Sequence, residues 1–133
     1  MRVNIRFIPH NLQRYETAGD YWFERDDKDE EVLQIRVSEL PDERMMWAIA
    51  IHELVEVLIC RWLKVDMAAI DHFDEVYEER RPLGNEEEPG DDPRAPYHLQ
   101  HGFATAAERI YCAAVGLNWK IYTDAVNLLS KPR

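Results

Sequence analysis

The sequence predicts a single α+β domain in which a small N-terminal antiparallel sheet packs on three to four helices. Two patterns support this fold class. Residues 1–40 place apolar side chains at alternate positions, as half-buried strands do, whereas residues 41–129 repeat them every three or four positions, as helices do. The chain has 133 residues, of which 46% are hydrophobic, so it is long enough for one domain with its own core.

Three strands are expected within the first forty residues. Residues 1–8 alternate between apolar and polar side chains, residues 20–24 carry an aromatic run, and residues 32–37 alternate again. The second and third segments flank a charged turn at residues 25–31. This arrangement predicts a β-hairpin with a longer loop.

The rest of the chain is expected to be mainly helical. A proline and two acidic residues suit the start of the segment 41–64, and the segment 67–80 is amphipathic. Residues 81–96 are acidic and rich in proline and glycine. We expect them to form a solvated loop, with a substrate lid as the second option. Residues 97–129 are expected to form the C-terminal helices.

Three polar residues interrupt the most apolar stretch of the chain. Of the sixteen residues from Met45 to Cys60, thirteen are apolar, and the others are His52, Glu53 and Glu56. On a helix, Glu56 lies about 40° and Glu53 about 100° from His52, so one arc holds all three. A helix that is apolar all round is buried, and burying these groups costs several kcal/mol unless something compensates them. A protein cation, a shared proton and a metal ion are the candidate compensators.

A second polar pair, His101 and Glu108, shares an apolar stripe of the helix predicted after residue 97. The two residues differ by about 20° in azimuth and lie roughly 10 Å apart along the helix axis. They are therefore too far apart to bind one ion comfortably. His101 is the candidate ligand, with His98 one turn before it as a substitute. Glu108 is expected to hold the ring of a liganding histidine or to support a second site.

Charge and cysteine content limit the partners and the compartment. The net charge of −10 argues against nucleic acid or an anionic membrane as a partner, and it fits a protein that gathers carboxylates around a cation. Cys60 and Cys112 lie in apolar helical patterns with no signal-peptide pattern ahead of them, so we expect reduced core thiols in a cytoplasmic protein. No apolar run has the length of a membrane span. The composition is compatible with a homo-oligomer.

Residues 52–56 read His-Glu-Leu-Val-Glu, an HExxE pattern. Positions i and i+4 of a helix can bind one metal ion, and a glutamate beside the histidine can activate a metal-bound water. With the strands before it, the segment 30–64 resembles the core of zincin-type metalloproteases. The whole chain also resembles small uncharacterised phage and prophage proteins.

The zincin resemblance implies a role for each polar residue of this pattern. His52 matches the first metal ligand, Glu53 matches the general base, and Glu56 stands where the family has its second histidine. A third ligand must come from further along the chain, and His101 is the first choice. In reserve stand His98, Asp71, Asp74 and Glu108. The implied function is a zinc-dependent hydrolase of peptide or amide bonds with a peptide or small-molecule substrate. Mg²⁺ or Mn²⁺ is expected instead of zinc only in the carboxylate-rich alternative described next.

Two other functions use the same helix differently. The spacing Glu53-x-x-Glu56, followed by Asp71-x-x-Asp74, is similar to that of the all-α nucleoside-triphosphate pyrophosphatases. This similarity implies Mg²⁺ and predicts that the two aspartates face the two glutamates. The third alternative is a non-catalytic acidic phage accessory protein that binds no metal, with water or an arginine such as Arg109 compensating the polar triplet.

Overall fold

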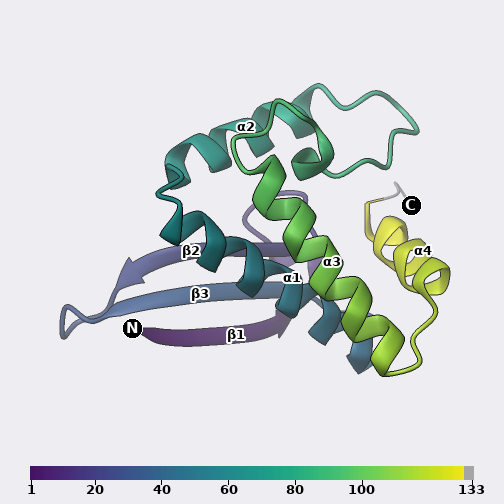
Figure 1. Cartoon of the computed structure of the whole chain (residues 1–133), viewed down its shortest axis with the longest axis horizontal. Coiled ribbons are helices and arrows are strands. Elements are labelled where there is room, and N and C mark those ends of the chain that lie inside the picture. Colours follow the sequence, from purple (N-terminus) through teal and green to yellow (C-terminus); the bar gives the residue numbers. More distant parts are fainter. Residues whose placement is uncertain (131–133) are drawn as a thin grey trace.

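The computed structural model describes residues 1–130, which form three β-strands, four α-helices and two short 3₁₀ turns (Figure 1). The predicted α+β fold class is confirmed. Element bounds differ by only one or two residues from the predicted segments 41–64 and 67–80. The elements are β1 (Arg2–Ile8), η1 (His10–Leu12), β2 (Gly19–Arg25), β3 (Glu31–Ser38), α1 (Glu43–Trp62), α2 (Met67–Glu79), η2 (Pro89–Asp91), α3 (His98–Ala114) and α4 (Trp119–Leu129).

The three strands form one mixed sheet in the order β1-β3-β2. β2 and β3 pair antiparallel, with Tyr21 opposite Ile35, which confirms the predicted hairpin. β1 pairs parallel to β3, with Ile5 opposite Ile35, so the prediction of an all-antiparallel sheet is wrong for this strand. The connection explains the difference, because residues 9–18 carry the chain to the far edge of β3 before β2 begins. Apolar alternation predicts which side chains face the core but not the direction of the neighbouring strand.

Helix α1 lies between the sheet and α3, and this position explains its composition. It contacts β2 and β3 on one side and α3 on the other (Figure 1). Asp42 caps its first turn by accepting a hydrogen bond from the Arg44 backbone N–H. A helix covered on two sides must be apolar around most of its circumference. His52 and Glu56 are buried members of this helix, and their side chains reach toward α3.

Both cysteines lie in the core, as the sequence analysis predicted. Cys60 and Cys112 are buried free thiols, as predicted for core residues. Within residues 1–130, no helix combines the length and the apolar character needed to cross a membrane.

Candidate metal centre

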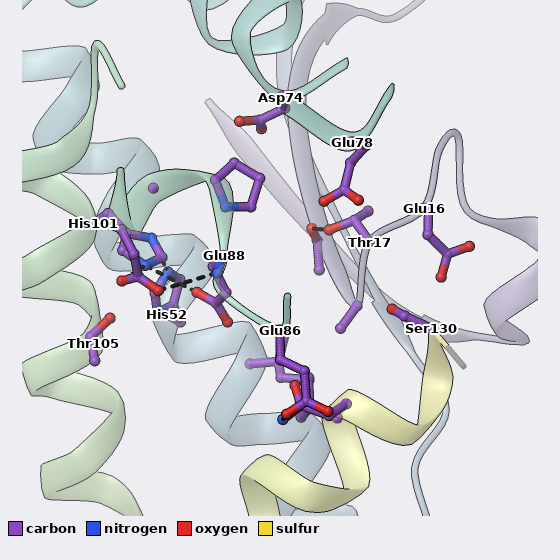
Figure 2. Close-up of a pocket in the computed structure, with 18 of the residues that line it drawn as sticks. Glu16, Thr17, His52, Asp74, Glu78, Glu86, Glu88, His101, Thr105 and Ser130 are labelled. Carbon is purple, nitrogen blue, oxygen red and sulfur yellow. Dashed lines mark hydrogen bonds and ion pairs between the residues drawn. The ribbon is translucent and has the colours of Figure 1, made fainter. Parts of the chain in front are cut away.

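A cavity of about 820 Å³ opens beside the buried polar residues of α1 (Figure 2). Its walls come from the start of β2, from α1, α2, α3 and α4, and from the loop that contains η2. The cavity therefore brings together parts of the chain that are far apart in sequence. His52, Glu53, Glu56 and His101 all line it.

Three donor atoms meet at the inner end of this cavity, and they belong to His52, Glu56 and His101, the residues that the sequence analysis named as candidate ligands. His52 Nε2 lies 3.1 Å from Glu56 Oε2 and 3.1 Å from His101 Nδ1, and Glu56 Oε2 lies 2.9 Å from His101 Nδ1. The i, i+4 spacing on α1 supplies the first two donors, and the first turn of α3 supplies the third. The three atoms form a nearly equilateral triangle.

The size of this triangle fits one metal ion. Ligand atoms about 2.0–2.1 Å from a tetrahedral zinc ion lie about 3.3 Å from one another. The observed separations of 2.9–3.1 Å are slightly shorter. The two imidazoles and one carboxylate could therefore bind the same ion with small side-chain adjustments.

Each of the two donors on α1 has a partner on its other side. Glu108 Oε1 accepts a hydrogen bond from His52 Nδ1 at 2.8 Å, and the Tyr122 hydroxyl donates to the second Glu108 oxygen. The Tyr21 hydroxyl donates to Glu56 Oε1 at 2.7 Å. Glu108 thus holds the ring of His52, one of the two roles predicted for it. Because Nδ1 makes this contact, Nε2 is the His52 nitrogen that is left to bind a metal ion.

The buried histidines and carboxylates of the site shift one another's pKa values. Burial alone would lower the pKa of both histidines, but the carboxylates around them outweigh it. The pKa of His52 lies well above its ordinary value, and that of His101 rises to about 12. Burial would raise the pKa of Glu56, yet hydrogen bonds from His101 and His52 lower it to about 2. A metal cation could take the place of the protons that the imidazoles hold here.

The acidic loop contributes two carboxylates that the sequence analysis did not assign to the site. Glu88 Oε2 lies 3.0 Å and Asp91 Oδ1 lies 3.2 Å from His101 Nε2. Gly90 packs directly on the His101 ring, which leaves no room for a Cβ. The acidic side chains of η2 are exposed, as expected for a solvated loop, but the buried Gly90 also docks this loop on His101, which the sequence analysis did not predict.

Glu53 lines the cavity beside the donor triangle. Its half-buried carboxylate makes no hydrogen bond or ion pair with any residue in the range 1–130. It packs on Gly19, where a Cβ would overlap the carboxylate and lie 2.6 Å from Ile49 Cγ2. Burial, followed by the charge of Glu56, raises the pKa of Glu53 well above its ordinary value. A carboxylate with a raised pKa that faces a cavity suits a general base.

The reserve ligands Asp71 and Asp74 line the same cavity but have other partners. Asp74 accepts hydrogen bonds from the hydroxyls of Tyr15, at 3.3 Å, and Tyr97. Burial raises the pKa of Asp74 to about 7. Asp71 lies 3.8 Å from the Arg14 guanidinium. In the described part of the chain, the group of acidic and histidine side chains close enough to share one ion consists of His52, Glu88 and His101, and it includes neither aspartate.

His98 and Arg109 also have roles other than those considered for them. His98 donates from Nδ1 to the Gly90 carbonyl at 2.9 Å, so it holds the acidic loop on α3. The Arg109 guanidinium lies 4.3 Å from the centroid of the Trp119 ring, which places it in a stacking contact. Compensation of the buried triplet by Arg109, one expectation of the non-catalytic alternative, is therefore not observed.

Comparison with known proteins gives no relative for this chain. A scan against protein-family models, a search of curated proteins and a search of solved structures each found no match. Function is therefore argued from the geometry and chemistry of the site.

Proposed function

We propose that this protein is a zincin-like, metal-dependent hydrolase that cleaves peptide or amide bonds. His52, Glu56 and His101 hold the metal, and Glu53 is the general base. One observation carries the proposal: three donor atoms lie 2.9–3.1 Å apart beside a cavity-lining carboxylate that has no partner within residues 1–130.

The donor set favours zinc. Mg²⁺ prefers oxygen ligands alone, whereas imidazole nitrogens suit zinc and other transition metals. Two histidines and one glutamate form one of the ligand sets of catalytic zinc sites, which keep a further position open. The carboxylates behind the imidazoles resemble the outer partners that orient histidine ligands in such sites.

The proposed chemistry divides between the ion and Glu53. A divalent metal bound here supplies a Lewis acid that polarises a carbonyl and lowers the pKa of water. Glu53 takes a proton from the attacking water and passes it to the leaving nitrogen. Its raised pKa suits both halves of this transfer, because the group must accept a proton and then release it. Glu108 and Tyr21 keep the ligands in position during the reaction.

Metal analysis of protein purified without added metal and without a histidine tag tests the proposal. We expect about one zinc ion per chain, as in other single-metal catalytic sites. His52→Ala should abolish zinc binding. His72→Ala is the matched control, because His72 is exposed on α2 and does not line the cavity. Metal-free wild-type protein, or full zinc content in His52→Ala, would overturn the proposal.

The Mg²⁺-dependent pyrophosphatase has less support. It implies an all-α fold, whereas three strands form a sheet within residues 2–38. The hydroxyls of Tyr15 and Tyr97 donate to Asp74, and such donors compete with a metal for its oxygens. Mg²⁺-dependent release of pyrophosphate from nucleotides, lost in Asp74→Ala, would replace the first proposal.

The non-catalytic alternative can be tested separately. A catalytically inactive binding protein predicts metal-free protein whose stability is unchanged by His52→Ala.

We also propose that the protein works in the cytoplasm, because its two buried thiols remain free, as expected in a reducing compartment.

A further inference from the structure

Helix α3 has a second apolar side, which points away from the core. Its buried side, which includes His101 and Glu108, packs on α1 (Figure 1). A surface helix with one packed side usually carries polar residues on the other. The exposed side of α3 instead carries apolar residues at alternate spacings of four and three positions, which are Leu99, Phe103, Ala106, Ile110 and Ala113. This is the spacing of the residues that face the partner helix in a coiled coil.

One side of α1 extends this apolar surface. Trp47, Ile51 and Trp62 lie on that side, and they are half-buried or exposed. Arg44 lies on the same side and donates to the carbonyl of Val115, the residue after α3, at 2.9 Å, so this side of α1 borders α3. We call the combined surface the α1–α3 face. Its large exposed side chains are Trp47, Trp62, Leu99, Phe103 and Ile110.

The α1–α3 face differs in charge from the rest of this acidic chain. The chain has 26 acidic residues and a net charge of −10. In α1 the acids after Glu43 are Glu53 and Glu56, and in α3 the acid is Glu108; all three line the cavity instead of this face. Two copies of such a chain repel each other through most of their surfaces. At the α1–α3 face they can approach without bringing carboxylates together.

The exposed apolar area of this face is large enough for a dimer interface. Its five large side chains are 41–78% exposed. At about 200 Å² for each large side chain, they expose on the order of 600 Å² per chain. Two copies together would bury more than about 1,000 Å², the lower limit for a specific interface. Monomers rarely leave so large an apolar patch in contact with water.

We propose that this protein is a homodimer in which the α1–α3 faces of two copies pack together. The stripe on α3 is complementary to itself when the two α3 helices run antiparallel about a two-fold axis. Residues equally far from the point between positions 104 and 105 then face each other, so Phe103 of one copy packs on Ala106 of the other, and Leu99 on Ile110. None of the five large side chains of the face lines the cavity, so the dimer leaves the cavity open. The dimer does not depend on the proposed metal centre.

Sedimentation equilibrium of the full chain tests this inference. At about 100 μM we expect twice the chain mass of 15.7 kDa. Ile110→Glu places a charge from each copy in the interface and should raise the dissociation constant about 30-fold or more. Ile121→Glu is the matched control and should match wild type, because Ile121 is also exposed but lies on α4, outside the α1–α3 face. Higher ionic strength should strengthen the dimer, because it screens the repulsion between two acidic chains.

Each outcome supports or overturns the dimer. Monomeric wild type at this concentration overturns it, and so does an Ile110→Glu variant that dimerises as tightly as wild type. An equal loss of dimer in Ile121→Glu also overturns the assignment to this face. Circular dichroism checks that each variant is folded, and Leu99→Glu, at the other end of the stripe, repeats the test if Ile110→Glu does not fold.

Discussion

Replacing Glu108 by glutamine is expected to weaken zinc binding about 10- to 100-fold, although Glu108 is not a ligand. Its carboxylate accepts from His52 Nδ1 at 2.8 Å and from the Tyr122 hydroxyl. The negative charge keeps the His52 proton on Nδ1 and makes Nε2 a stronger base. Glutamine preserves the shape but removes the charge, and the expected loss corresponds to about 1.4–2.8 kcal/mol of binding free energy.

Competition with a chromophoric chelator measures this affinity directly. Glu79→Gln is the matched control, because Glu79 is exposed at the end of α2 and does not line the cavity. Unchanged zinc affinity in folded Glu108→Gln would refute the argument that this carboxylate prepares His52 for the metal. An equal loss of zinc affinity in Glu79→Gln would show that the effect comes from the net charge of the chain.

Three further predictions concern the cavity wall. Glu53→Gln should keep its zinc and lose hydrolytic activity by about 10²- to 10⁴-fold on a peptide library, and loss of the metal as well would contradict a role as base alone. Gly19→Ala should cost about 1–3 kcal/mol in urea unfolding, because a Cβ overlaps Glu53 and lies 2.6 Å from Ile49, and unchanged stability would contradict this close packing. The pKa of Asp74 is raised from 3.8 to about 7, so the folded state holds a proton that the unfolded chain releases, and this stabilisation is lost as pH rises through about 7. The stability of Asp74→Asn relative to wild type should therefore increase from about pH 5 to pH 8 in thermal unfolding, and parallel pH profiles would refute the raised pKa.

The parts of the site that depend on local helix geometry could be predicted from the sequence. His52 and Glu56 are one helical turn apart, and His101 is polar on an apolar stripe, so each could be singled out before its neighbours were known. The contact between Glu88 and His101 could not be predicted, because no periodicity encodes the path of an irregular loop. A run of acidic residues reads the same whether it is solvated or docked, and Gly90 looks like any turn glycine until the His101 ring is seen against it.

The sheet shows the same division between local and long-range information. Alternation identified all three strands, and the charged turn identified the hairpin of β2 and β3. The parallel pairing of β1 depends on where the chain crosses between residues 9 and 18, and this crossing is set by packing across the whole domain. Such pairings are decided by topology, which short sequence windows do not contain.

The three donor atoms also join two helices that are far apart in the sequence. Glu56 and His101 are 45 residues apart, and between them they join α1 to α3. An ion held by both would close that length of polypeptide as a covalent cross-link does, which restricts the unfolded chain by an amount equivalent to about 4 kcal/mol. That is a large share of the roughly 5–15 kcal/mol by which domains remain folded. A chelator would then destabilise the fold as well as abolish activity, and the concentration of available metal would set the fraction of chains that remain folded.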